Sequence, residues 1–217
     1  MMKLKGIKGK NIMDKKQILL EKLAKLAVEV GVNVQKDQVV VVNSPLHAAP
    51  LTRLIQKEAY LRGAKMVYVE WSDSEITKNY YTYASDETLQ EITSFQYDKL
   101  KYMVDNNACR ISIDSRIPNA MAGVDMKRVM MANRVVGPKL SFVSNHYSSS
   151  KSQWTIVAYP NDEWCKTVFP DLETSEAWDK LYDAIMYASR VDLETDPTKN
   201  WKEHTDKLAE HSKVLND

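Results

Sequence analysis

Apolar positions follow two different patterns between residues 15 and 42. Between Lys15 and Val30 they recur on one helical face, and Gly31 predicts the end of that helix. The run of four valines at 39–42 contains no polar residue, which is typical of a strand buried on both faces. This stretch therefore predicts a helix followed by an interior strand.

The same alternation continues along the rest of the chain. Further strands are predicted at 66–71, 109–113 and 154–159, each after a helical pattern. The predicted helices cover residues 51–63, 72–83, the region of 100–104, a stretch from 125, a short segment after 161, 178–188 and 196–215.

Two local signals refine these helices. Ser72 as a cap, with Glu75 three residues later, predicts a capping box that opens the helix toward Tyr83. Gly137 and Pro138 predict that the helix beginning near 125 kinks or ends there.

Four strands separated by helices predict an α/β fold. We expect a largely parallel sheet of at least four strands, a Rossmann-like layer with helices on both faces and two long C-terminal helices. Residues 14–217 are expected to form a single domain, because no linker rich in Gly, Ser or Pro divides them. Residues 1–13 are basic and lack either period, so we expect a disordered leader. Met1 and Met13 both stay open as the natural start.

Composition narrows the possible partners. The 217 residues contain 30 Lys and Arg against 29 Asp and Glu, a formal net charge of +1. A balanced charge argues against nucleic acid as the main partner, and no run of about twenty apolar residues predicts a membrane span. Cys109 and Cys165 are far apart and form no CxxC pair. A reduced, cytoplasmic protein is expected.

Polar residues gather at the predicted carboxyl ends of the strands. Ligands of open α/β sheets usually bind at this edge, so these residues are candidates for a cavity-facing site. Helix capping is the alternative interpretation, because Ser, Asp and Asn favour caps. The candidates are Asn43, Ser44, Ser72, Asp73, Asp114, Arg116 and Asn161.

Other familiar site chemistries lack their residues. The turn after the first strand has no glycine to cradle a phosphate, and no GxSxG motif occurs. His204 and His211 lie two turns apart on one predicted helix and could hold a metal, but the lysines around them favour a solvated face. His47 and His146 are interpreted as isolated.

Several sequence blocks, in a fixed order, resemble one family. The blocks are Leu26–Gln35, Asn43-Ser44-Pro45, Ala59–Lys65, Trp71–Thr77, Trp154–Pro160, Trp164–Asp171, Arg190-Val191-Asp192, Asp196-Pro197 and Trp201–His204. Together they make the chain, from about Asp14 to its last residue, similar to the N-terminal domain of metallo-aminopeptidases of the aminopeptidase T and aminopeptidase S kind.

The resemblance implies removal of N-terminal amino acids from peptides by two divalent metals, such as zinc or cobalt, that activate a bridging water. In that family the Glu, His and Asp ligands lie in a second domain without a counterpart here. The resemblance therefore transfers no catalytic or metal-binding residue. We expect this chain alone to bind no metal and to be inactive.

The family is dimeric and encloses its active sites in a cavity, which implies a scaffold, dimerisation and cavity-forming role for this domain. Homodimerisation or other self-association is expected, with Trp201, Leu208 and Leu215 as candidate contacts. Three alternatives stay open: a truncated part of an aminopeptidase, a freestanding non-catalytic binding or assembly module, and an enzyme with its own site at the strand ends.

Overall fold

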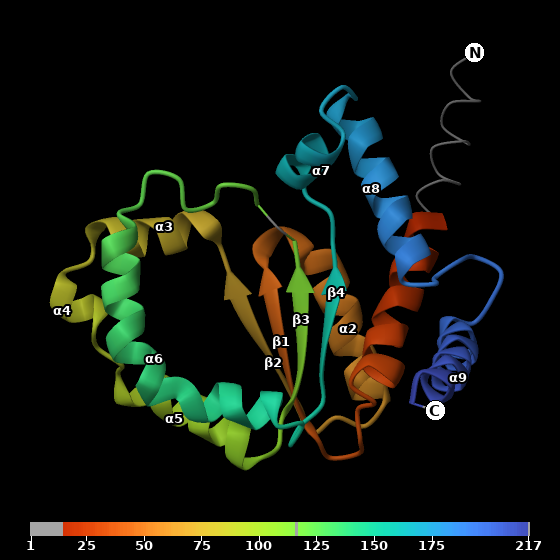
Figure 1. Ribbon diagram of the computed structural model, residues 1–217, viewed down its shortest axis with the longest axis horizontal. Coiled ribbons are helices and arrows are strands. Elements are labelled where there is room, and N and C mark those ends of the chain that lie inside the picture. Colours follow the sequence, from red (N-terminus) through yellow and green to blue (C-terminus); the bar gives the residue numbers. More distant parts are fainter. Residues whose placement is uncertain (1–14, 116, 217) are drawn as a thin grey trace.

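A four-stranded parallel sheet forms the centre of the computed structural model, which describes residues 15–115 and 117–216 (Figure 1). The strands lie in the order β2-β1-β3-β4. Their bounds are β1 Val39–Pro45, β2 Met66–Ser72, β3 Cys109–Asp114 and β4 Trp154–Ala158. The predicted α/β fold with a parallel sheet is confirmed. The predicted leader at 1–13 lies outside the described residues.

Helices connect the strands and follow the last one. Residues 15–26 form a helix that continues into the π-helical turn η1 (Ala27–Gly31). The others are η2 Leu46–Ala48, α2 Ala49–Leu61, α3 Ser74–Tyr83, α4 Asp86–Leu89, α5 Ser94–Asp105, α6 Met126–Ser148, α7 Asp162–Val168, α8 Thr174–Ala188 and α9 Pro197–Asn216. The two long C-terminal helices, α8 and α9, match the prediction. In the described part of the chain, no helix has the length and apolarity needed to cross a bilayer.

One face of the sheet carries the main hydrophobic core. Val40 and Val42 of β1 pair with Cys109 and Ile111 of β3, and all four side chains are 0% exposed. Helix 15–31, α2 and α8 pack against this face. The alternating valines, Val39 and Val41, are buried on the opposite face. The four-valine run therefore is buried on both faces, as the sequence predicts.

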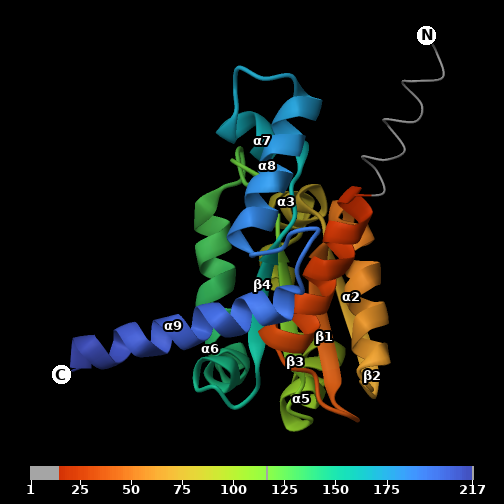
Figure 2. The ribbon, with the colours of Figure 1, turned by 90° about the vertical axis from the view of Figure 1, so that its right-hand side faces the viewer.

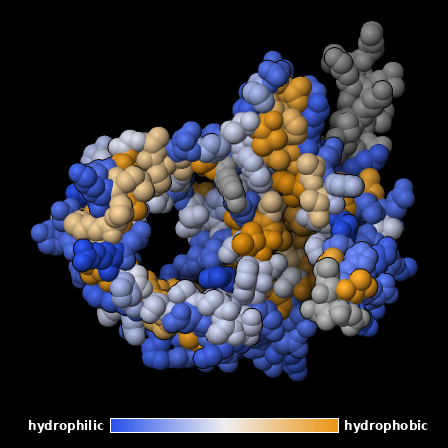
Figure 3. Space-filling view, viewed as in Figure 1, coloured by the Kyte–Doolittle hydropathy of each residue, from blue (hydrophilic) through white to orange (hydrophobic). Residues whose placement is uncertain are grey.

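The opposite face of the sheet is covered unequally. At the amino end of the strands, Met103 of α5 and Ala108 pack on Val39 and Val41. Toward the carboxyl end, α3, α4 and α6 form an arch (residues 74–89 and 126–148) that stands away from the sheet (Figure 1). Figure 3 shows an opening through the molecule between this arch and the sheet.

Arg128 of α6 joins the parts of the arch. Its Nε donates to the carbonyl of Tyr81 at 2.9 Å, and its Nη1 pairs with Oδ1 of Asp86 at 2.7 Å. Its Nη2 also donates to the carbonyl of Ala84. One planar guanidinium therefore binds the end of α3, the start of α4 and the loop between them.

The predicted capping box at Ser72 is wrong. β2 extends through Ser72, which pairs with Pro45 of β1, so the strand still occupies the position expected for the cap. Asp73 caps α3 instead, with Oδ1 accepting from the backbone N–H groups of Glu75 at 2.9 Å and Ile76 at 3.0 Å. The predicted helix is present, but its cap is one residue later.

Pro138 does not end the helix that contains it. α6 runs from Met126 to Ser148, and its ribbon changes direction partway along (Figure 1). Gly137 and Pro138 are exposed, so water can satisfy the carbonyl that proline leaves without a donor. The predicted kink agrees with this change of direction, and the predicted helix end is wrong.

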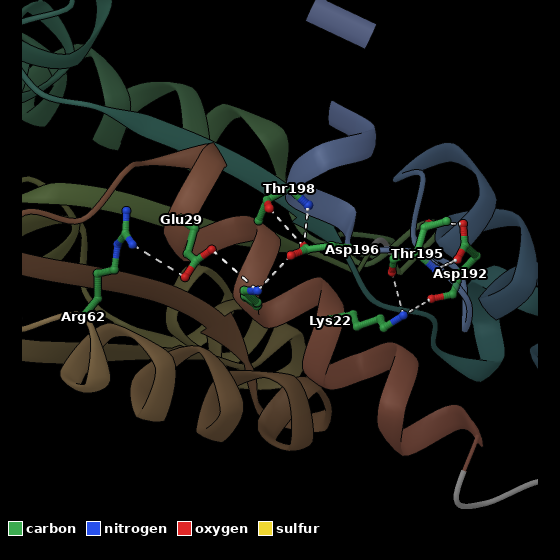
Figure 4. Close-up of polar contacts among 8 residues, drawn as sticks. Lys22, Glu29, Arg62, Asp192, Thr195, Asp196 and Thr198 are labelled. Atoms are coloured by element: carbon green, nitrogen blue, oxygen red, sulfur yellow. Dashed lines mark hydrogen bonds and ion pairs between the residues drawn. The ribbon is translucent and has the colours of Figure 1, made fainter. Parts of the chain in front are cut away.

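A polar network fixes the loop between α8 and α9 to helix 15–31 (Figure 4). The Lys22 ammonium donates to the carbonyls of Asp192 and Thr195, both at 2.7 Å. Lys25 pairs with Asp196 at 3.3 Å. The loop is therefore anchored just before α9 begins, and the far part of α9 extends away from the rest of the fold (Figure 2).

Candidate functional site at the carboxyl edge of the sheet

The strand order creates a switch point between β1 and β3. The chain leaves β1 toward β2 on one side and leaves β3 toward β4 on the other. In open α/β sheets this divergence opens a crevice beyond the carboxyl ends of the two strands, and ligands bind there. The residues that follow β1 and β3 are therefore the first place to look for a site.

A histidine and a serine meet at this switch point. His47 lies in η2, directly after β1, and Ser115 directly follows β3. The Nε2 atom of His47 is 2.6 Å from Oγ of Ser115. Ser115 Oγ also accepts from Nδ2 of Asn161 at 3.1 Å, and Asn161 Oδ1 caps α7 by accepting from Trp164 N–H at 2.8 Å. These bonds link the ends of β1 and β3 to the start of α7.

The surroundings of His47 favour the neutral imidazole. Partial burial of the ring lowers the pKa of His47 from its ordinary value of 6.5, while the nearby carboxylates of Glu163, Asp73 and Asp162 act in the opposite direction. A neutral imidazole beside a hydroxyl can accept a proton near pH 7.

A cavity of about 220 Å³ lies beside the pair. Ser72, Asp73 and Thr77 form its wall on the side of β2 and α3, and Ile117 and Met121 supply apolar surface. The cavity is smaller than the roughly 300–1,000 Å³ typical of sites for drug-sized ligands. It has room for a small polar group.

The structure brings some of the predicted residues together at this edge. Ser72 and Asp73 line the cavity, and Asn161 joins it through Ser115. Asp114 is the half-buried last residue of β3, and its carbonyl accepts from Tyr159 N–H at 2.9 Å. Arg116 lies outside the described residues.

Two predicted residues have other surroundings. Ser44 is 1% exposed, and its Oγ lies 2.6 Å from the hydroxyl of Thr52 in α2, so it belongs to the packing of that helix. Asn43 points to the sheet face that carries Ser112, to whose Oγ it donates at 3.4 Å. Neither lines the cavity.

The interpretation of His47 as isolated is wrong. Its partner, Ser115, is 68 residues away in sequence, and the contact depends on β1 and β3 being neighbours. His146 also has a partner, Ser152 Oγ at 2.7 Å, but that pair is buried. The position of His47 shortly after a predicted strand was the one available signal.

A metal centre does not fit the residues described. Within 15–115 and 117–216, no group of three or more His, Cys, Asp or Glu side chains is arranged to hold a metal ion. His204 contacts Arg190, with 3.0 Å between Nδ1 and Nη2, and packs on Trp201. We therefore derive no catalytic step through a metal.

Residues 16–217 match the family described as thermophilic metalloproteases, M29. The chain belongs to the M29 family. The chain is 38% identical over 197 residues to aminopeptidase 2 of Geobacillus stearothermophilus, covering 91% of this chain and 48% of that protein. Aminopeptidase AmpS of Bacillus subtilis is 37% identical over 205 residues, with coverages of 94% and 50%.

A solved M29 structure has the same fold. Wild-type AmpT from Thermus thermophilus aligns with a TM-score of 0.75 and 28% identity, over 86% of this chain and 45% of that chain. The predicted resemblance to aminopeptidases T and S is confirmed. The chain spans about half the length of the curated M29 relatives that it matches.

Proposed function

We propose that this chain is the part of an M29 metal-dependent aminopeptidase that forms the wall of the peptide cavity. The observation that carries the proposal is the match of residues 16–217, nearly all of the chain, to the M29 family. The similar aminopeptidases are about twice as long as this chain. The relatives are named aminopeptidases, so peptides are the substrate class that we assign to the intact protein.

The described residues support a cavity role better than a catalytic one. M29 is a metalloprotease family, but no cluster of metal-ligating side chains occurs in the described part of this chain. We propose that other residues of the intact protein bind two divalent ions, such as zinc or cobalt. We also propose that residues 14–217 act as one α/β scaffold and that the intact protein is cytoplasmic. The opening between the arch and the sheet (Figure 3) provides a concave surface for that role.

We also infer self-association through α9. Leu208 is 52% exposed and Val214 is 76% exposed on a helix whose far part extends away from the sheet (Figure 2). Trp201, a candidate contact, is half-buried against the main core and donates through Nε1 to the carbonyl of Ser189 at 2.7 Å. Leu208 and Val214 are therefore better contacts than Trp201. The side chain of Leu215 lies outside the described residues.

A turnover assay tests the proposed division of roles. The purified chain is incubated with leucine p-nitroanilide, with and without added cobalt or zinc, beside aminopeptidase T of Thermus thermophilus as the positive control. We expect release of p-nitroaniline by the control alone. Metal-dependent turnover by this chain that survives repurification would contradict the proposal, because its own residues would then have to hold the metals.

A further inference from the structure

The sheet face toward the arch carries polar side chains in its middle. Asn43 of β1 pairs with Glu70 of β2 and with Ser112 of β3, so the three side chains lie in one row on one face. Arg110 is two residues before Ser112 and shares that face. Interior parallel strands usually carry apolar residues on both faces. These polar side chains are half-buried, so water or a ligand can complete their hydrogen bonds.

A cavity of about 210 Å³ lies over this polar face, between the sheet, α5 and α6. Asn43, Glu70 and Arg110 line it from the sheet, Lys99 lines it from α5, and Tyr147 lines it from α6. Lys99 Nζ lies 2.7 Å from Oε2 of Glu70, so these two charges compensate each other. The cavity therefore combines a neutralised ion pair with the guanidinium of Arg110.

Tyr147 holds the guanidinium of Arg110 in place. The guanidinium carbon lies 4.0 Å from the centre of the Tyr147 ring. Tyr147 is 4% exposed, and its hydroxyl donates to the carbonyl of Ala108 at 2.9 Å. Stacking on a fixed aromatic ring orients a guanidinium and leaves the N–H groups at its edge available for bonding.

Arg110 has no carboxylate partner among the described residues. The ion pairs of residues 15–115 and 117–216 include Lys99 with Glu70 and Arg128 with Asp86, but none that involves Arg110. Arg110 is half-buried, and an uncompensated charge at such a position is costly unless a ligand or water completes it. The planar guanidinium matches a carboxylate, which it can bind through two parallel N–H···O bonds.

We propose that Arg110 binds the carboxylate of a peptide in this cavity. The inference rests on the proposed function, because it takes peptides as the ligands of the opening. The cavity is too small for a whole peptide, so it accepts a single residue whose carboxylate reaches Arg110. The C-terminal carboxylate and an acidic side chain share this chemistry, and the experiment separates them.

Three short peptides test the proposal on the purified chain by isothermal titration calorimetry. Leu-Gly-Gly offers a terminal carboxylate, Leu-Gly-Gly-amide offers none, and Leu-Gly-Glu-amide offers a side-chain carboxylate. We expect one of the two acidic peptides to bind roughly tenfold more tightly than Leu-Gly-Gly-amide, as loss of a charged hydrogen bond predicts. Whichever acidic peptide binds more tightly identifies the source of the carboxylate.

Substitution of Arg110 then tests whether this side chain causes the difference in affinity between the acidic peptides and Leu-Gly-Gly-amide. Arg110→Met keeps an unbranched stem over Tyr147 and removes the charge, so it should abolish the preference for the acidic peptide. Arg110→Lys keeps the charge without the planar fork and should retain part of the preference. Arg53→Met removes an exposed charge from α2, which packs on the opposite face, and should leave the preference unchanged.

The outcomes separate this proposal from the proposed function. Equal binding of all three peptides overturns the role of Arg110 and leaves the peptide-cavity role intact. No binding of any peptide overturns both. A carboxylate preference that persists in Arg110→Met overturns the assignment to Arg110. The comparison of acid with amide uses the unsubstituted chain, so it shows whether the chain prefers a carboxylate even if a variant fails to fold.

Discussion

The Nε2 atom of His47 lies 2.6 Å from Oγ of Ser115, and this contact joins the carboxyl ends of two neighbouring strands. The two residues follow β1 and β3, between which the direction of the chain connections diverges. A hydrogen bond across the switch point places the imidazole of His47 beside a small cavity. The contact therefore ties the position of His47 to the pairing of β1 with β3.

We predict that the free energy of unfolding falls as the pH decreases, because His47 becomes protonated more readily in the unfolded chain. Its pKa lies below 6.5 in the folded chain, so on acidification the unfolded chain takes up the proton first. The contribution of neutral His47 to stability is then complete above about pH 6.5 and is lost below it. Urea unfolding at several values between pH 5 and pH 7.5 measures this slope.

His47→Gln supplies the control for the pH prediction, because it removes the titrating ring. It should flatten the slope without abolishing it, since burial also lowers the pKa of His146. An imidazole titration by NMR that places His47 above 6.5 would show that Glu163, Asp73 and Asp162 outweigh the burial of the ring.

We predict that Arg128→Met loosens the arch. Arg128 binds Tyr81, Asp86 and Ala84, and hydrogen bonds to a charged group contribute about 1.5–3 kcal/mol each. Hydrogen exchange should become faster in residues 74–89 while the strands keep their protection. Arg134→Met, at an exposed position of the same helix, is the matched control. Unchanged exchange in 74–89 would mean that other contacts hold the arch.

We predict that Gly31→Ala destabilises the fold by about 1–3 kcal/mol. A Cβ atom at Gly31 would lie 2.8 Å from Cγ2 and 2.9 Å from Oγ1 of Thr155 in β4. Thr155→Ala removes both atoms, so the double variant should lose less stability than the sum of the single variants. Additive losses in urea unfolding would contradict a direct clash between the two positions.

We predict that the chain self-associates through α9. Light scattering at rising concentration should give a mass above 24.9 kDa. Leu208→Asp and Val214→Asp should lower that mass, because each places a charge on an exposed apolar position. Tyr83→Asp alters a side chain at the end of α3 that is 81% exposed and serves as the control. A single 24.9 kDa species at high concentration would overturn the inference.

The fold could be predicted because its signals are local. The valines at 39–42 are apolar since β1 is an interior strand with a helix layer on each face, and that burial is visible as an unbroken apolar run. The error at Ser72 has a local cause as well. Ser and Asp both make good caps, and the pairing of Ser72 with Pro45 selects Asp73.

The candidate site could be predicted only in part. The strand ends identified Ser72, Asp73 and Asn161, since a parallel sheet collects its carboxyl ends at one edge. The pairing of His47 with Ser115 depends on strand order, which no local pattern encodes. Arg110 was missed for a different reason: the alternating apolar and polar residues of β3 give no sign that it stacks on Tyr147.

The anchored loop before α9 fixes where that helix begins, and the length of the helix then fixes how far its end lies from the core. Lys22 and Lys25 fix the residues from Asp192 to Asp196, so the direction in which α9 leaves the sheet is determined at its first turn. A helix of 20 residues is about 30 Å long, at about 1.5 Å per residue. A partner that binds near Val214 is therefore held at a fixed distance from the core. Loss of the Lys22 hydrogen bonds would change the direction of α9 without changing its length.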